Sequence, residues 1–193
     1  VDTLTLTEGG LDTVNLGAGN DVYNHTGGAV DVITLGTGDD QINVGAAYDN
    51  SSDAFTVVDF EAGAANDVIV IDVSEVDGAT ADLVDNLDAT NYIEGSLGTV
   101  GANDVALAVA SNSVMVLTGN SYATYAAVEA ELAIEAGGAL TDIAVVFLNS
   151  TSGVAEMYVS DTTGSATNDF LMASFSNMTA LTDLEVLTTD NIT

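Results

Sequence analysis

Aspartate recurs in a nearly constant register over the first quarter of the chain, behind glycine-rich turns. The separations are 10, 9, 10 and 9 residues, between Asp2, Asp12, Asp21, Asp31 and Asp40. Two stretches carry the full pattern, LGAGNDVYN over 16–24 and LGTGDDQIN over 35–43. Glycine allows positive φ angles, so backbone carbonyl groups can turn toward one centre, and each aspartate adds a carboxylate. Calcium prefers six to eight such oxygen ligands, at about 2.3–2.6 Å. The spacing therefore predicts calcium-binding turns.

The charge balance of the chain also favours a bound cation. The 193 residues include 30 Asp and Glu, no Lys or Arg and one His, for a formal net charge of -30. Like charges on a compact body repel one another, and the Debye length falls from about 8 Å at physiological salt to about 3 Å at 1 M. Either high salt or bound metal must offset this repulsion. Nucleic acid and anionic membrane surfaces are excluded as partners, because no Lys or Arg is present to neutralise their phosphates.

The repeats predict short strands that must stack. An apolar residue follows each aspartate by two positions: Leu4, Val14, Tyr23, Ile33 and Ile42. A strand of three or four residues cannot bury an apolar face alone, so successive strand–turn–strand units must pack on one another. One turn of such a stack holds two nine-residue units. We therefore expect Asp12 beside Asp31 and Asp21 beside Asp40, at opposite edges.

These residues resemble the calcium-binding nonapeptide of RTX proteins, G-G-x-G-x-D-x-U-x, which forms a parallel β-roll. The likeness covers residues 2–49, with weaker copies where Glu8 and Ala29 replace glycine and a degraded copy that ends at Asp49. The resemblance implies Ca2+ as the cofactor, with a ligand set of Asp2, Gly10, Asp12, Gly17, Gly19, Asp21, Gly28, Asp31, Gly36, Gly38, Asp40 and Asp49. The alternative is a series of Gly/Asp hairpin turns without metal. Four copies in register favour the metal.

Residues 53–193 differ in composition and predict a second, β-rich domain after a roll at 1–52. Two strands around a loop at 61–66 are expected within 53–72, in a segment that resembles the one that often follows RTX rolls. Apolar, β-branched runs predict further strands that begin at Asp104, Ser113, Asp142, Val154 and Asp169. One helix is expected near 121–136, with Ser121 as N-cap and Gly137 as C-cap, and a weaker one at 79–93. The predicted fold class is thus mainly β: a short calcium-binding parallel β-roll, then a β-rich domain with one or two helices.

No enzyme site is recognisable, and we expect no catalytic activity. His25 is the only histidine, and cysteine, lysine and arginine are absent. Serine–histidine and cysteine–histidine nucleophiles and two-histidine zinc sites therefore lack parts. Carboxylate pairs with the spacing of a glycoside hydrolase arise by chance among 30 acids, so they carry no signal. We expect His25 to be an exposed loop residue.

The C-terminal stretch ALTDLEVLTTDNIT, residues 180–193, is apolar and acidic with no basic residue. It resembles the uncleaved signal that RTX proteins use for type I secretion. Together with the repeats, it predicts a secreted, calcium-dependent structural protein of the cell surface or extracellular matrix, such as an S-layer or filament subunit. We expect such a subunit to associate with itself through calcium-dependent contacts and not to insert into a membrane. Two alternatives remain open: a secretion and folding module of a larger RTX enzyme, such as a protease or lipase, or an adhesin tail. The chain starts within a repeat, so we also expect it to be a piece of a longer protein.

Overall fold

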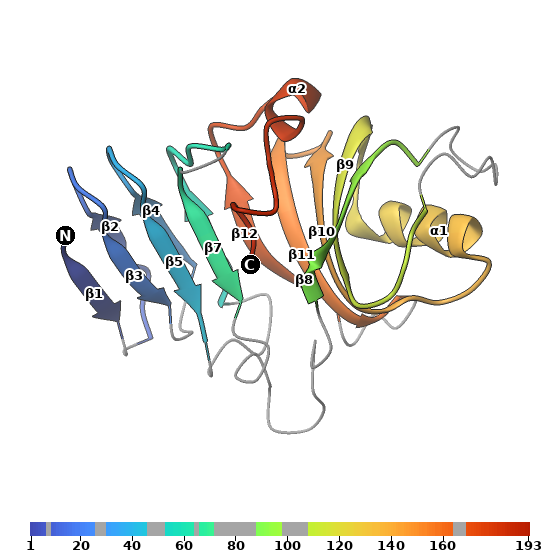
Figure 1. Cartoon of the computed structure of the whole chain (residues 1–193), viewed down its shortest axis with the longest axis horizontal. Coiled ribbons are helices and arrows are strands. Elements are labelled where there is room, and N and C mark those ends of the chain that lie inside the picture. Colours follow the sequence, from blue (N-terminus) through green and yellow to red (C-terminus); the bar gives the residue numbers. More distant parts are fainter. Residues whose placement is uncertain are drawn as a thin grey trace.

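The computed structural model describes residues 1–6, 9–25, 30–45, 53–63, 66–71, 88–97, 108–163 and 169–193. The strands and helices are β1 (Thr3–Leu6), β2 (Thr13–Asn15), β3 (Val22–His25), β4 (Asp31–Thr34), β5 (Gln41–Val44), β6 (Phe55–Val57), β7 (Val68–Ile71), β8 (Asp88–Gly95), β9 (Ser113–Tyr122), α1 (Tyr125–Ala136), β10 (Thr141–Asn149), β11 (Val154–Thr162), β12 (Asp169–Phe175) and α2 (Leu181–Leu184). The fold is mainly β, which confirms the predicted class. The strands form a four-stranded parallel sheet, β1-β3-β5-β7, and an eight-stranded mixed sheet, β2-β4-β6-β12-β11-β10-β9-β8 (Figure 1).

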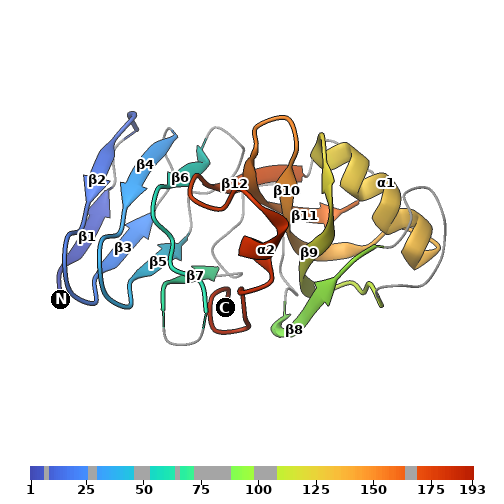
Figure 2. The ribbon, with the colours of Figure 1, turned by 90° about the horizontal axis from the view of Figure 1, so that it is seen from above.

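The first seven strands alternate between the two sheets. β1, β3, β5 and β7 pair in parallel in one sheet, and β2, β4 and β6 pair in parallel in the other. Figure 2 shows these strands as successive turns at the N-terminal end of the molecule. The register advances by 19 residues per turn in the repeats, as in the pairs Thr3–Val22 and Thr13–Val32. Asp12 therefore lies beside Asp31 and Asp21 beside Asp40, in different sheets, as the spacing predicts.

The apolar residue that follows each aspartate by two positions belongs to the core. Val14, Tyr23, Ile33 and Ile42 are buried in one cluster, and Leu4 packs against it partly buried. Alternate residues of these strands face outward and form polar ladders; for example, Asn43 Nδ2 donates to Asn24 Oδ1 at 2.7 Å. Each large side chain contributes about 1.5–3 kcal/mol when fully buried, which a strand of three or four residues obtains only by stacking.

The eight-stranded sheet joins the repeats to the rest of the chain. β6 pairs in parallel with β12, and β12, β11 and β10 then pair antiparallel. β9 pairs in parallel with both β10 and β8, and α1 connects β9 to β10. Val128 and Leu132 of α1 pack on one face of this sheet with Phe147, whereas the other face joins the cluster that contains Ile33. The sheet and this cluster both extend across the predicted domain boundary between residues 52 and 53.

Most predicted elements are present, but two helix predictions need correction. Strands β9 to β12 begin at or next to four of the five predicted starts. The fifth predicted start, Asp104, lies outside the described residues. β6 and β7 lie within 53–72, as expected. α1 ends at Gly137 as predicted, but its N-cap is Thr124, whose Oγ1 accepts from Ala127 N at 3.3 Å, and Ser121 belongs to β9. The helix predicted at 79–93 is wrong over 88–93, which pairs with β9 as part of β8; residues 79–87 lie outside the described residues. Pairing in the sheet has overridden local helix propensity there.

The last three residues of the chain extend the four-stranded sheet beyond β7. Ile69 N donates to Asn191 O at 2.8 Å, and Thr193 N donates to Ile69 O at 2.9 Å. The Asn191 side chain is buried, accepts from Gly63 N at 3.0 Å, and donates to Gly63 O at 3.0 Å and Asp67 O at 2.8 Å. The C-terminal stretch thus folds against the repeat turns.

Asn191→Ala is expected to lower the free energy of unfolding by roughly 2–4 kcal/mol, because the buried carbonyl group of Asp67 and the partly buried backbone groups of Gly63 lose their partners. Asp190→Ala is the matched control, since Asp190 is the adjacent residue but is exposed. We expect that variant to stay within about 0.5 kcal/mol of the parent chain. Urea unfolding of both variants in excess calcium measures the difference. Equal losses for the two variants would show that the Asn191 contacts do not stabilise the fold.

Candidate metal site

Four aspartates line one edge of the stacked turns: Asp2, Asp21, Asp40 and Asp67. The backbone N–H of each of the first three donates to the carboxylate of the next aspartate in this row. The distances are 2.6 Å from Asp2 N to Asp21 Oδ1, 2.7 Å from Asp21 N to Asp40 Oδ1, and 3.1 Å from Asp40 N to Asp67 Oδ1. We call this row the Asp21–Asp40 edge. The carboxylates are held by the backbone of the preceding turn, so their positions depend on stacking.

Two of these carboxylates have an oxygen with nothing to bind. Asp21 and Asp40 are each 1% exposed, and Oδ2 of each is buried without a hydrogen-bond partner. A buried, ionised oxygen without a partner costs several kcal/mol, so such groups are normally paired or coordinate a metal. Asp67 differs, because its Oδ2 accepts from Glu61 N at 2.7 Å. Among these four aspartates, Asp21 and Asp40 are therefore the two with an unpaired, buried carboxylate oxygen.

The turns before these two aspartates depend on glycine. Their glycines have positive φ angles of 97°, 127°, 107° and 132°, at Gly17, Gly19, Gly36 and Gly38. Neighbouring turns also touch there, since a Cβ on Gly38 would lie 2.1 Å from Gly19 O. A Cβ on Gly19 would lie 3.6 Å from Asp21 Oδ1. The carbonyl oxygen of Gly19 thus lies against Gly38 in the next turn.

The electrostatics of this edge disfavour ionised carboxylates without a cation. Burial raises the pKa of Asp40, and the neighbouring carboxylates of Asp21, Asp59 and Asp39 raise it further, against the lowering effect of the Asp21 N–H. Burial likewise raises the pKa of Asp67 to about 6. The exposed Val1 amine lies 3.7 Å from Asp21 Oδ1, in contact with the oxygen that already has a donor. A divalent cation at the unpaired oxygens would supply the missing counter-charge.

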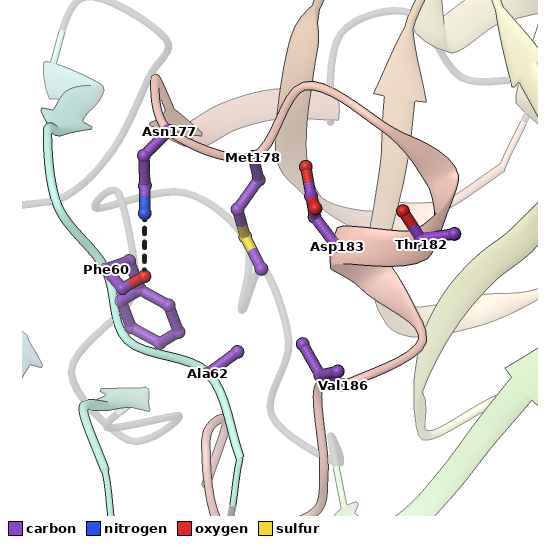
Figure 3. A pocket seen from close by; sticks show the side chains of 7 residues that line it. All are labelled: Phe60, Ala62, Asn177, Met178, Thr182, Asp183 and Val186. Atoms are coloured by element: carbon purple, nitrogen blue, oxygen red, sulfur yellow. Dashed lines mark hydrogen bonds between the residues drawn. The ribbon is translucent and has the colours of Figure 1, made fainter.

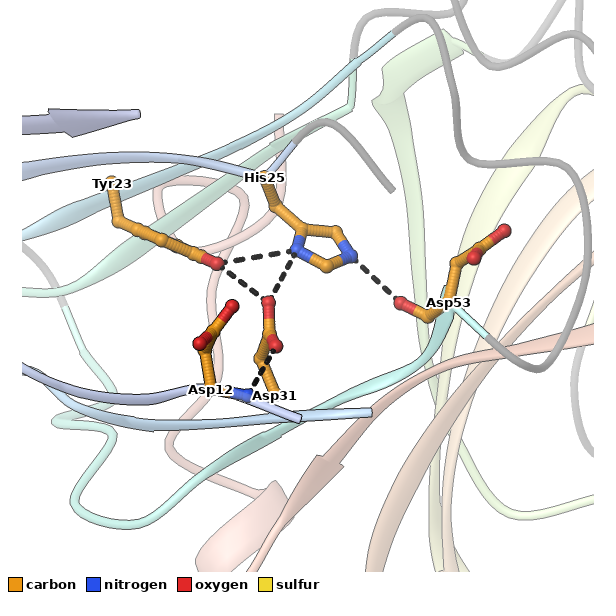
Figure 4. Close-up of polar contacts among 5 residues, drawn as sticks. All are labelled: Asp12, Tyr23, His25, Asp31 and Asp53. Carbon is orange, nitrogen blue, oxygen red and sulfur yellow. Dashed lines mark hydrogen bonds and ion pairs between the residues drawn. The ribbon is translucent and has the colours of Figure 1, made fainter. Parts of the chain in front are cut away.

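The other edge, with Asp12 and Asp31, is built differently (Figure 4). Asp31 Oδ1 accepts from Asp12 N at 3.1 Å, and its Oδ2 accepts from the Tyr23 hydroxyl at 2.8 Å. His25 Nδ1 lies 3.5 Å from Asp31 Oδ2, and His25 Nε2 is 2.7 Å from the carbonyl oxygen of Asp53. Burial raises the pKa of Tyr23, and its hydrogen bond to Asp31 raises it further, so the phenol stays protonated and donates. The expectation of an exposed His25 is wrong: the residue is 1% exposed, because β3 directs it into the core.

The structure brings together only some of the predicted ligands. The structure brings Asp21 and Asp40 together with Gly17, Gly19, Gly36 and Gly38, and brings Asp12 next to Asp31. Asp2 is exposed at the end of the Asp21–Asp40 edge, and Gly10 has no positive φ angle. Gly28 and Asp49 lie outside the described residues. Within the described ranges, no three His, Cys, Asp or Glu side chains converge as a metal group. A cation here would therefore need backbone carbonyl or water oxygens as well.

Two aspartates of the stack are absent from the predicted set. Asp67 continues the aspartate row, and Asp59 accepts from Leu35 N at 2.8 Å and Gly36 N at 3.0 Å, which holds the second turn in place. The signal for Asp67 is present in the sequence, because Ile69 follows it by two positions as in the repeats. Three residues separate Gly63 from Asp67, whereas one separates Gly19 from Asp21 and Gly38 from Asp40, and this difference obscures the register. Asp59 has no such signal, since its contact comes from the stacking of strand β6 on β4.

A cavity of about 220 Å³ lies between the turn after β6 and the C-terminal residues (Figure 3). Its apolar walls are Phe60, Ala62, Met178 and Val186. Two of the polar side chains around it have structural partners, since Asn177 Nδ2 donates to Phe60 O at 2.9 Å and Asp183 Oδ2 accepts from Ala180 N at 2.9 Å, and the third, Thr182, is exposed. We therefore assign this cavity to packing and not to a ligand.

Comparison with protein-family models, with curated proteins and with solved structures finds no match to the chain. The candidate site is therefore assigned from its geometry and chemistry alone. In the described part of the chain, no helix has the length and apolar character needed to cross a bilayer.

Proposed function

We propose that the chain binds Ca2+ along the Asp21–Asp40 edge and that its stacked turns act as an RTX-like β-roll that folds with the metal. The observation that carries this proposal is the pair of buried carboxylate oxygens, Asp21 Oδ2 and Asp40 Oδ2, without partners in adjacent turns. The chain has no Lys or Arg side chain that could pair with these two oxygens in a salt bridge. A bound cation would offset such a charge without protonating the carboxylate.

The donor set favours calcium over softer metals. Carboxylate and backbone carbonyl oxygens are hard ligands, and calcium accepts six to eight of them in flexible geometry. Asp21 and Asp40 would supply two carboxylates, and carbonyl oxygens of the glycine turns would supply further ligands. Water completes the shell, because no third acidic side chain converges there among the described residues. Calcium bound in this way would hold two turns together and neutralise part of the row.

Metal affinity in such a stack becomes folding free energy, since the ligands come together only when the turns stack. Low cytoplasmic calcium would keep the repeats unfolded, and millimolar external calcium would fold them after export. We therefore propose a secreted, extracellular or cell-surface protein without catalytic activity. The acidic, apolar C-terminal stretch supports type I secretion through its resemblance alone.

We propose a structural role, as a surface-layer, filament or matrix subunit that associates with itself in calcium. β1 and β2 are the outermost strands of their sheets at the N-terminal end, and such edges pair readily with another chain. A second role is favoured by the opposite end of the stack, where β12 covers β6 and residues 191–193 cover β7. A stack closed at one end suits a module that ends a longer array of repeats. That arrangement fits the folding and secretion module of a larger RTX protein or an adhesin tail.

Asp40→Asn tests the calcium proposal, with Asp39→Asn as its matched control. Both changes remove one charge from the same turn, but Asp39 is exposed and contacts Asn20, whereas Asp40 is buried. Calorimetric titration should show calcium binding to the parent chain, loss of at least one binding site in Asp40→Asn, and an affinity within about twofold of the parent for Asp39→Asn. Absence of calcium binding by the parent chain, or the same number of sites in both variants, would refute the assignment.

A further inference from the structure

We infer that the two edges of the stack have different roles: metal binds along the Asp21–Asp40 edge alone, while the Asp12–Asp31 edge is closed by Tyr23 and His25 without metal. This inference rests on the proposed function and changes its ligand set, which the repeat pattern distributes over both edges. It assigns Asp12 and Asp31 to the scaffold. Four observations support it.

The first observation is the hydrogen bonding of the two central carboxylates. Both oxygens of Asp31 are engaged, Oδ1 by Asp12 N at 3.1 Å and Oδ2 by the Tyr23 hydroxyl at 2.8 Å. Asp40 has only its Oδ1 engaged, by Asp21 N at 2.7 Å. A carboxylate with donors on both oxygens already has part of its charge offset, so it gains less from a cation. One with an unpaired buried oxygen gains an interaction instead.

The second observation concerns the groups around each carboxylate. Those near Asp40 are the carboxylates of Asp21, Asp39 and Asp59, which add negative charge. Near Asp31, a hydroxyl donor and an imidazole face the carboxylate from β3, beside the neighbouring carboxylate of Asp12 (Figure 4). The Tyr23 hydroxyl thus offsets part of the Asp31 charge, whereas no donor in the described part of the chain faces the unpaired oxygen of Asp40.

The third observation is how the space beside Asp31 is filled. A carbonyl oxygen can only accept, so His25 Nε2 donates to Asp53 O at 2.7 Å, which fixes the ring and directs Nδ1 toward Tyr23 and Asp31. The His25 ring also packs on the Phe55 ring, with centroids 5.0 Å apart. Tyr23 and Phe55 are fully buried. Aromatic rings occupy the place in which a hydrated ion would need oxygen ligands.

The fourth observation is the conformation of the turns. The turns before Asp21 and Asp40 each contain two glycines with positive φ angles. The turn before Asp12 has Gly9 and Gly10, and neither has a positive φ angle. In the sequence, the copy before Asp31 has Ala29 in place of a glycine and His25 as an additional residue. The repeat thus departs from its pattern on the same edge where the protein supplies its own partners.

The test is a count of bound calcium at saturation, by equilibrium dialysis, for four variants in two matched pairs. Asp21→Asn and Asp40→Asn change the proposed metal edge; Asp12→Asn and Asp31→Asn change the other. We expect at least one ion fewer per chain for each variant of the first pair and an unchanged count for each of the second. Counting at saturation separates a lost site from a general loss of stability, which would lower affinity without changing the number of ions.

Asp12→Asn keeps the test decisive if Asp31→Asn does not fold. The Asp12 carboxylate is only half-buried, and its backbone N–H, which the substitution retains, makes the bond to Asp31. Loss of an ion in Asp12→Asn would overturn the inference while leaving calcium binding intact. A parent chain that binds no calcium would instead overturn the proposed function. Tyr23→Phe should lower the urea midpoint in calcium with the ion count unchanged; a lower count would also overturn the inference.

Discussion

Removal of calcium with EDTA at low ionic strength is expected to unfold the stacked turns that contain β1 to β5. Without metal, Asp21 and Asp40 keep buried oxygens without partners, and their negative neighbours remain uncompensated. A ligand that binds only the folded state stabilises it by about 2.7 kcal/mol per site at a hundredfold excess over its dissociation constant. Loss of even one such ion would therefore remove a large fraction of the free energy of unfolding of a typical domain. Circular dichroism and urea unfolding, with EDTA and with millimolar calcium, measure the effect.

Sodium chloride at the ionic strength of the calcium sample separates binding from screening. Salt weakens repulsion between exposed carboxylates, but it screens buried groups much less. We therefore expect sodium chloride to restore only part of the stability lost in EDTA. Identical unfolding curves in EDTA and calcium, with no calcium retained by the protein, would refute the metal-dependent stack.

The metal-free protein should also show an unusual dependence on pH. Burial raises the pKa of Asp67 to about 6 in the folded state, above the ordinary value of 3.8. A raised carboxyl pKa means that the folded state binds the proton more tightly, so this contribution is fully present below pH 3.8 and is lost as pH rises through 6. In EDTA with sodium chloride added to restore part of the stability of the stack, lowering the pH from 7 to 5 should therefore raise the urea midpoint. A fall in the midpoint over that range would contradict the assigned burial of Asp67.

Gly36→Ala is expected to destabilise the stack by about 4 kcal/mol or more. Gly36 has a φ angle of 107°, and a Cβ there would lie 1.7 Å from the carbonyl oxygen of Gly17 in the preceding turn. The substitution therefore adds backbone strain and a steric overlap between two backbones, neither of which a side-chain rotation can relieve. Urea unfolding in excess calcium measures the loss.

Gly17→Ala is the matched control, because Gly17 occupies the same position one turn earlier. Its φ angle is 97°, but no described atom lies within 4 Å of a Cβ placed there. We expect that variant to lose only the strain of a positive φ angle, about 1–3 kcal/mol. The excess loss in Gly36→Ala then measures the contact between turns. Equal losses in the two variants would mean that the turns do not stack as closely as described.

The local features of the repeat part could be predicted from the sequence. The aspartate spacing determined which residues lie beside one another, because each turn of the stack uses the same number of residues. Val14, Tyr23, Ile33 and Ile42 could be predicted as core residues from their constant offset to aspartate. Gly17, Gly19, Gly36 and Gly38 have the positive φ angles that their type permits. Spacing and side-chain type are properties of single short segments, which is why they were sufficient here.

The partners of the acidic groups depended on the tertiary structure. Asp31 and Asp40 have the same place in the repeat, yet Tyr23 and His25 engage one and no side chain engages Oδ2 of the other. The difference requires β3 and β4 to lie in different sheets with their side chains directed at each other, which spacing along the chain does not encode.

The closed end of the stack also depended on contacts between distant segments. Asn191 donates to Asp67 O across 124 positions, and β6 pairs with β12 across more than a hundred. β8 formed where the local pattern indicated a helix, because β9 offered backbone groups to pair with. A buried backbone N–H or carbonyl must find a partner, but the amino-acid sequence does not state which of many distant segments supplies it. The sequence thus determined the repeating unit, and only the assembled sheets decided which carboxylates were left with an unpaired oxygen.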